Sequence, residues 1–287
     1  MRQVRVLEQR LRTVGEINLR VADTAKTLDG FIAQAQALVD AAGITAPPVD
    51  PESLAKLRGI VRVVVRDGLG ASGQLRREKG RLIIELGSEE PIERRNFTCC
   101  HEIAHTFALD DSSSKFRDLQ PGAPCTRYTR EEYLCDRAAA EMLMPTKFFR
   151  PAAIELEPGI ASVIQLARQF RSSIRATLVR IGQVAAWPTV FLVWRFSSRF
   201  GSTKKLRVSW SVKPEGARCF VPRHAPADPR SGMYATFVSA RSTMETETLN
   251  LGTLRGKYLV ENKRFGDYLV SVVHHPNLHR LTLRGEA

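Results

Sequence analysis

The spacing of apolar residues changes along the chain, from helix-like before Trp187 to strand-like after it. Residues 82–86 are apolar except for Glu85 and are followed by Gly87, which predicts a buried strand. Ser88 can then cap a helix whose first turn holds residues that favour a helix start: Glu89, Glu90 and Pro91. Apolar residues further along recur at three- and four-residue intervals and predict one buried helix face: Phe97, Cys100, Ala104 and Phe107.

A second amphipathic helix is predicted downstream, because Leu134, Ala138 and Met142 repeat every four residues. The alanine run from Ala138 to Ala140 has small side chains, so a neighbouring helix can approach it closely. We therefore expect the two helices to pack together and to present side chains to a common site.

Residues 160–184 predict two more helices, 163–170 and 173–180, joined by a tight turn as in a helix-turn-helix unit. Basic side chains on this pair would suit a DNA phosphate backbone: Arg168, Arg171, Arg175 and Arg180. Spacing alone does not distinguish a buried helix pair from one that lies in a DNA groove. Both interpretations stay open at this point.

Beyond Trp187 the apolar residues alternate with polar ones. The alternation predicts strands at residues 190–196, 206–212, 234–240 and 268–275. We therefore expect an α+β chain with two domains. Residues 1–185 would be mainly helical with a small sheet, and residues 186–287 would form a mostly β accessory domain.

Composition argues for a globular protein outside the membrane. The hydrophobic content is 43%, and no apolar run approaches the roughly 18 residues of a membrane span. The N-terminal residues mix arginines with Glu and Gln and lack the apolar segment of a secretory signal, so we expect a cytoplasmic protein. The 5 cysteines include no C-x-x-C pair and predict free, mostly buried thiols.

Positive charge is concentrated in the last third of the chain. The net charge is +13, and residues 186–287 hold 16 Lys and Arg against 7 Asp and Glu, for +9. Such a surface can attract nucleic acid or an acidic protein. Because no base-reading element is apparent there, direct and specific DNA binding is not favoured.

The strongest chemical signal is the HExxH pentapeptide at residues 101–105. His101 and His105 lie one helical turn apart, so both rings can reach one tetrahedral ion. Glu102 lies about 100° round the helix. It is therefore a poor third ligand but a good candidate for the general base of a zinc hydrolase.

Glu132 on the second predicted helix can supply a third protein ligand and leave one position open, as catalytic zinc sites require. Asp136, one turn further on, can accept the free ring N–H of a ligand histidine. A rival interpretation makes Glu132 the partner of Thr129 in a helix capping box. Glu131 is expected to point elsewhere and Glu141 lies more than two turns away, so neither is a preferred ligand.

Two histidines and one carboxylate suit Zn²⁺ best but also accept Mn²⁺ or Fe²⁺. The other histidine cluster, His274, His275 and His279, has no acid or cysteine at ligand spacing. We interpret it as a strand end followed by a solvated tail. Tyr128 and Tyr133 are within sequence reach of the site as oxyanion partners, and the sequence does not choose between them.

Three segments together resemble the ImmA/IrrE-like metallopeptidases, a family of the gluzincin group. Residues 47–55 look like the family's entry segment, residues 97–105 are similar to its HExxH helix, and residues 136–145 look like its signature ending in Leu-Met-Pro. The resemblance covers roughly residues 30 to 185. The chain departs from the family at Cys135-Asp136, where Ala-Asn is common, and at Ala138, where Phe is common.

This resemblance implies a helical, zincin-like peptidase core that binds metal through His101, His105 and Glu132 and uses Glu102 as its base. It also implies that residues 160–184 support the peptidase domain. The implied activity is that of a metal-dependent endopeptidase that cuts a helix-turn-helix transcriptional repressor at a limited site, in stress response or mobile-element transfer. Two alternatives remain: a non-catalytic regulator of the same fold that binds a repressor or DNA, and a DNA-binding factor whose HExxH is structural.

Overall fold

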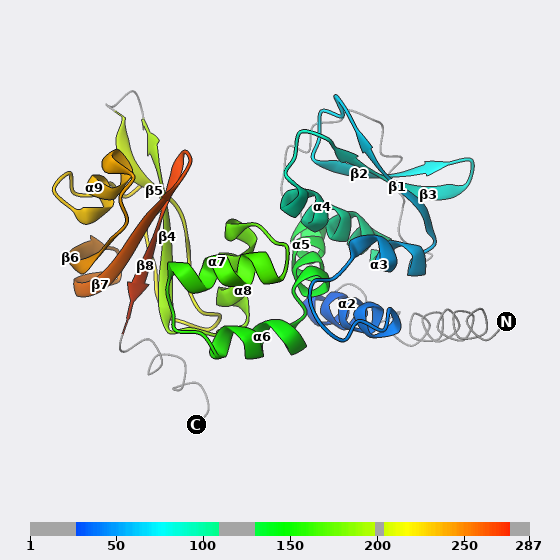
Figure 1. The fold of residues 1–287 in the computed structure, drawn as a ribbon, viewed down its shortest axis with the longest axis horizontal. Helices are drawn as coiled ribbons and strands as arrows, with labels where there is room; N and C mark the ends of the chain where they lie inside the picture. Colours follow the sequence, from blue (N-terminus) through cyan, green and yellow to red (C-terminus); the bar gives the residue numbers. More distant parts are fainter. Residues whose placement is uncertain (1–26, 109–129, 199–203, 276–287) are drawn as a thin grey trace. The chain divides into compact units, whose positions relative to one another are not determined.

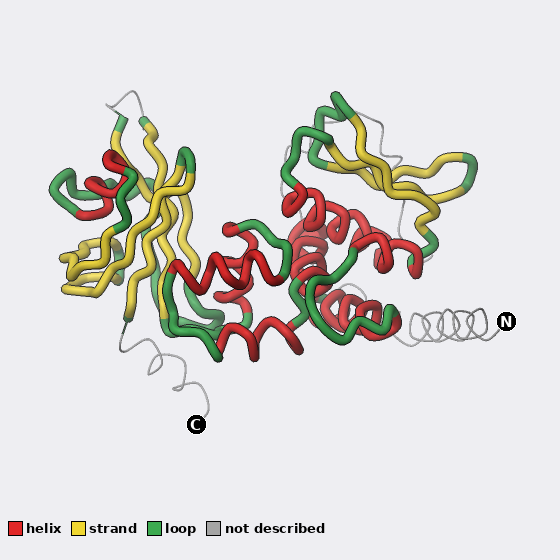
Figure 2. Tube along the Cα trace, in the orientation of Figure 1, coloured by secondary structure: helices red, strands yellow, loops and turns green. Residues whose placement is uncertain are grey.

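The computed structural model describes residues 27–108, 130–198 and 204–275 (Figure 1). The chain divides into two compact units, residues 1–149 with 167–173 and residues 150–166 with 174–287. Helices and a small sheet in the first unit, and a larger sheet in the second, confirm the predicted α+β class with a mostly β C-terminal part (Figure 2). The domain division at residue 185 stays a prediction.

The first unit combines four α-helices with a three-stranded sheet among its described residues. The helices are α2 (Leu28–Ala41), α3 (Pro51–Leu57), α4 (Ile92–His105) and α5 (Arg130–Leu143), and the short 3₁₀ helix η1 (Thr106–Ala108) follows α4. The strands are β1 (Ile60–Arg66), β2 (Gly73–Glu78) and β3 (Arg81–Gly87). Strand β3 lies in the middle, parallel to β1 and antiparallel to β2, so β2 is an edge strand.

Helix α4 begins at Ile92, so the prediction that Ser88 caps it was wrong. Pro91 occupies the cap position and has no side-chain cap hydrogen bond. A proline also disfavours helical geometry in the residue before it, here Glu90, which keeps the helix from starting earlier. The Glu90 carboxylate instead accepts a hydrogen bond of 2.6 Å from the Ser72 hydroxyl, next to β2.

Helices α4 and α5 pack against each other through small buried residues. Ala138 and Ala139 are fully buried on α5, and Cys100, Ile103 and Ala104 are fully buried on α4. The predicted apolar stripe is confirmed at Cys100 and Ala104 on α4 and at Phe107 on η1, while Phe97 is only half-buried. The alanine run therefore lets the two helices approach as predicted.

Arg58, just after α3, holds the C-terminal end of α4. Its Nε donates to the Thr106 hydroxyl and its Nη2 to the Thr106 carbonyl, each at 2.8 Å. The last carbonyls of a helix have no partner within the helix, so a cation there satisfies one of them and suits the helix dipole. This clamp lies directly beyond His105.

Three helices follow α5 in the chain: α6 (Thr146–Ile154), α7 (Ile160–Gln169) and α8 (Ile174–Gln183). Helices α7 and α8 are joined by a short turn, as predicted. Arg180 is only 2% exposed, so it cannot contact a DNA phosphate in this structure. The other arginines of the pair are exposed: Arg168, Arg171 and Arg175.

The second unit is built on a five-stranded antiparallel sheet in the order β5-β4-β8-β7-β6. The strands are β4 (Thr189–Ser197), β5 (Lys205–Val212), β6 (Thr243–Leu251), β7 (Leu254–Phe265) and β8 (Tyr268–His274). Helix α9 (Gly232–Ser239) contacts β6, β7 and β8. Its Met233 joins the core that the sheet buries on this face.

The predicted strand at residues 234–240 was wrong, because this segment forms most of α9. The Ser231 side chain caps the helix by accepting the Tyr234 N–H, and the Glu247 carboxylate accepts the Gly232 N–H. A short apolar run fits a strand and a helix equally well by pattern, and here the caps favour the helix. Strands β6 and β7 were not predicted.

Free thiols were predicted, and the cysteines in the described part of the chain confirm this: Cys99, Cys100, Cys135 and Cys219 are free and buried. Cys125 lies outside the described residues. Within residues 27–108, 130–198 and 204–275, no helix combines the length and apolar character that a membrane crossing needs.

Candidate metal centre

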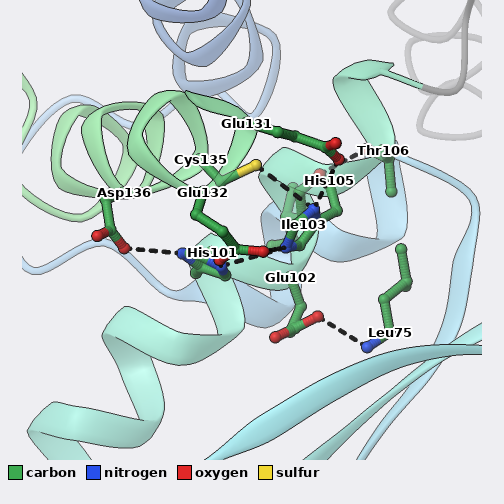
Figure 3. Close-up of polar contacts among 10 residues, drawn as sticks. All are labelled: Leu75, His101, Glu102, Ile103, His105, Thr106, Glu131, Glu132, Cys135 and Asp136. Carbon is green, nitrogen blue, oxygen red and sulfur yellow. Dashed lines mark hydrogen bonds and ion pairs between the residues drawn. The ribbon is translucent and has the colours of Figure 1, made fainter. Parts of the chain in front are cut away.

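The two HExxH histidines meet at one end of α4 (Figure 3). His101 Nε2 and His105 Nε2 are 3.2 Å apart, and the rings stand edge to face with centroids 4.9 Å apart. The side chains are 15% and 22% exposed. Both imidazoles thus lie at the edge of the buried surface, as the helical pattern predicted.

Glu132 reaches both histidines from α5. Its Oε2 lies 3.1 Å from His101 Nε2, and its Oε1 lies 3.8 Å from His105 Nε2. Among the residues that the structure describes, these three side chains form the one group that could hold a metal ion, with ligand atoms all within 4.8 Å of one another. The rival capping box depends on Thr129, which lies outside the described residues.

The candidate donor atoms lie about as close together as the ligands of one metal ion. Bonds of about 2.0 to 2.1 Å place tetrahedral ligands roughly 3.3 to 3.4 Å apart. The two histidine Nε2 atoms are 3.2 Å apart, Glu132 Oε2 lies 3.1 Å from the first, and the other oxygen of Glu132 lies 3.8 Å from the second. Two imidazole nitrogens and one carboxylate oxygen are donors that suit zinc and accept manganese or iron. The residues present therefore fit a divalent metal ion.

Asp136 contacts the ring nitrogen of His101 that faces away from the candidate metal position. His101 Nδ1 lies 2.9 Å from Asp136 Oδ1. When the ring is neutral, its Nδ1–H can donate to this carboxylate, and the lone pair of Nε2 is then available to a metal ion. Burial would lower the pKa of His101, but the hydrogen bonds with Asp136 and Glu132 outweigh burial and raise it to about 10. Asp136 thus lies where the sequence predicted a supporting carboxylate.

Glu131 also contacts the site, although it was expected to point elsewhere. Its Oε1 lies 3.3 Å from His105 Nδ1, and the Cys135 sulfur lies 3.5 Å from the same nitrogen. Glu131 and Glu132 are consecutive on α5, so their side chains leave the helix about 100° apart. They can therefore approach opposite sides of the His105 ring.

Glu102 is buried beside the centre, at 8% exposure, on the side of α4 that faces β2. Its Oε2 accepts a hydrogen bond of 2.7 Å from the Leu75 backbone N–H on that strand (Figure 3). Burial raises the pKa of Glu102, while the positive charges of His105 and His101 and the Leu75 N–H act in the opposite direction. Glu102 stays outside the ligand group, as its position on the helix predicted.

The hydrogen bond from Leu75 to Glu102 was not predicted from the sequence. The sequence carries no signal for this contact, because only the packing of β2 on α4 brings the two residues together.

Tyr133 is 40% exposed, and its hydroxyl accepts a hydrogen bond of 3.4 Å from Arg137. Tyr128, the other predicted candidate for the oxyanion partner, lies outside the described residues.

Strand β8 ends at His274, and burial lowers the pKa of that histidine. His279 also lies outside the described residues.

Comparison with known families decides the assignment of this region. Residues 58–182 match the family described as the IrrE N-terminal-like domain. The chain resembles that family over this region. The resemblance to ImmA/IrrE-like metallopeptidases is thereby confirmed, and the matched residues include α4, α5 and every residue of the candidate metal centre.

Two curated relatives are similar to part of the chain, and both are called radiation response metalloprotease IrrE. The protein from Deinococcus deserti is 28% identical over 143 residues, which are 47% of this chain and 50% of the relative. The protein from Deinococcus radiodurans is 28% identical over 113 residues, or 39% of this chain and 34% of the relative. The matches thus span half the length of one relative and a third of the other.

A solved structure, a transcriptional regulator from Mycobacterium tuberculosis, resembles the chain over 96% of its length and over 84% of its own. The TM-score is 0.56 and the sequence identity is 15%. At this identity the likeness shows a shared fold. It carries no functional assignment by itself.

Proposed function

We propose that this protein is a metal-dependent endopeptidase whose metal ion, zinc by preference, is held by His101, His105 and Glu132. The observation that carries the proposal is the position of Glu132. It reaches both histidine Nε2 atoms from a second helix, at 3.1 and 3.8 Å. The matched domain and the two metalloproteases similar to it support the same assignment.

The donor set supports a catalytic rather than a purely structural ion. Three protein ligands leave one tetrahedral position open, whereas structural zinc sites close all four. When bound, the ion would polarise the scissile carbonyl and acidify a water molecule. The partial exposure of both histidine side chains keeps this side of the centre accessible to a substrate.

Glu102 is the proposed general base. It would take a proton from the attacking water and later pass that proton to the nitrogen of the leaving amine. The Leu75 N–H holds one carboxylate oxygen in place, so the side chain loses little freedom when it reacts. Burial, which raises the pKa of Glu102, helps the carboxyl to keep the proton until the amine leaves.

The substrate we propose is a helix-turn-helix transcriptional repressor, cut at a limited site in the cytoplasm. This part of the proposal rests on the resemblance to ImmA/IrrE-like metallopeptidases. The basic C-terminal part, with a net charge of +9, could attract an acidic surface of such a protein.

Co-expression with repressors encoded next to its gene tests the proposal, with wild type and Glu102→Gln side by side. We expect a discrete repressor fragment with wild type and none with the variant, while both proteins retain one metal ion per chain. A repressor still cut by Glu102→Gln would exclude Glu102 as the base. Binding of a repressor by both proteins without any cleavage would favour a non-catalytic regulator instead.

A further inference from the structure

We propose that Glu131 is a positioning residue that orients His105 as a metal ligand, as Asp136 does for His101. The inference rests on the proposed metal centre and adds a residue to it. It assigns a role to the acidic residue that directly precedes Glu132.

Both ligand histidines have a carboxylate on the nitrogen that faces away from the metal position. His101 Nδ1 lies 2.9 Å from Asp136 Oδ1, and His105 Nδ1 lies 3.3 Å from Glu131 Oε1. A carboxylate at this position keeps the proton on Nδ1, turns the ring and increases the basicity of Nε2. The contact of His105 is longer, and the Glu131 side chain is 58% exposed against 38% for Asp136.

The geometry of α5 explains why both contacts come from one helix. Residues four apart lie on the same side of a helix, so Glu132 and Asp136 form one row and Glu131 and Cys135 form the next. The first row faces His101 and the second faces His105 Nδ1. The segment Glu131 to Asp136 thus contacts both imidazoles through two adjacent rows of side chains.

Cys135 shares the His105 nitrogen, so its contribution must be separated from that of Glu131. Its sulfur lies 3.5 Å from Nδ1, close to the 3.3 Å of the carboxylate oxygen. A thiol is a weak hydrogen-bond partner, whereas a bond from an imidazole N–H to a charged carboxylate is among the stronger ones. The carboxylate is therefore the group expected to fix the ring.

Competition with a chelating dye for Zn²⁺ tests the inference on the full chain. We expect Glu131→Ala to weaken zinc binding about 10- to 100-fold, the range for removal of such a partner. Glu93→Ala is the matched control, since it removes the same charge from the first turn of α4, and it should stay within about twofold of wild type. Cys135→Ala should lie close to the control.

A second readout separates ring orientation from general stability. The Co²⁺-substituted protein has a visible spectrum that reports ligand geometry, and we expect Glu131→Ala to change it while the melting temperature of the metal-free protein stays the same. Glu131→Gln keeps an acceptor oxygen without the charge, so it should recover part of the lost affinity.

The outcomes distinguish this inference from the proposed function. Loss of zinc from His105→Ala together with wild-type affinity in Glu131→Ala would overturn the role of Glu131 alone. A Cys135→Ala variant that loses the affinity while Glu131→Ala keeps it would transfer the role to the thiol and also overturn the inference. Zinc retained by His105→Ala would instead contradict the metal centre.

Discussion

At the scale of single residues, the centre depends on hydrogen bonds that hold groups in one protonation state. His101 donates to Asp136 and lies beside Glu132, and Glu102 accepts the N–H of Leu75. Each contact holds in one rotamer a side chain that would otherwise move among several. These side chains therefore lose their conformational entropy when the chain folds rather than when a substrate binds.

Replacement of Asp136 should separate hydrogen bonding from charge. We expect Asp136→Ala to lower zinc affinity about 10- to 100-fold, because His101 loses the acceptor of its Nδ1–H. Asp136→Asn keeps an acceptor oxygen and should lose much less. Isothermal titration with a competing chelator measures both values, and equal losses in the two variants would show that the charge alone matters.

Zinc affinity should rise with pH. The pKa of His101 in the metal-free protein is raised to about 10, because Asp136 and Glu132 stabilise its protonated form. A metal ion needs the neutral ring, so it must displace that proton at any pH below the pKa, at a cost of about tenfold in affinity per pH unit for one proton. Titrations in buffers of different ionisation enthalpy count the released protons. An affinity independent of pH between about 6 and 8 would contradict the expected competition.

At the scale of elements, the position of Glu102, the proposed general base, depends on the distance between β2 and α4. Gly73 makes that distance short, since a Cβ at this position would lie 2.4 Å from Thr98 Cγ2 on α4 and 3.2 Å from the Glu85 carbonyl on β3. Leu75, which holds Glu102, is two residues further along the same strand. A side chain at Gly73 would therefore push the strand away from the helix.

Gly73→Ala should destabilise the protein by about 1 to 3 kcal/mol, the usual cost of overpacking a well-packed site. Peptidase activity should fall further than zinc affinity, because the displaced strand carries the Leu75 N–H and none of the candidate metal ligands. Urea unfolding and steady-state kinetics measure the two effects. Thr98→Ser removes the clashing methyl group, so the double variant Gly73→Ala/Thr98→Ser should be more stable than Gly73→Ala alone. If the stability losses of the two single variants simply add in the double variant, the proposed clash is wrong.

At the scale of the whole molecule, the candidate metal centre lies within one of the two units. All the candidate ligands, Glu102 and Leu75 belong to the unit formed by residues 1–149 and 167–173. The second unit carries the five-stranded sheet and most of the excess positive charge. None of the described residues of the second unit belongs to the candidate metal centre.

Metal binding should therefore stabilise the two units unequally. The proposed zinc ion would link α4 to α5, so hydrogen exchange of their backbone amides should slow on loading, by an amount that grows with the free zinc concentration. The strands β4 to β8 should exchange at unchanged rates. Mass spectrometry of peptic fragments with and without a chelator makes the comparison, and equal protection of the second sheet would show that the units respond together.

Local pattern predicted the parts of the fold that depend on neighbours in the chain. The three- and four-residue spacing of apolar residues predicted two helices, and α4 and α5 confirm them. The candidate ligands His101 on α4 and Glu132 on α5 lie within 3.1 Å of each other. Ser88 misled the prediction because the proline at 91 decides where α4 begins. Residues 234–240 misled it because a short apolar run has no unique period.

The sequence by itself determined that the two histidines of α4 point the same way, because side chains at i and i+4 must lie on one side of a helix whatever surrounds it. It also predicted that the third candidate ligand, Glu132, comes from the following helix. Only the tertiary structure decided which contacts complete the site. The Leu75 N–H reaches Glu102 because β2 packs on α4, and Glu131 reaches His105 because α5 lies close enough for two rows of side chains to contact α4. These contacts join residues more than 25 positions apart. No local pattern encodes them, since they follow from how buried surfaces fit together.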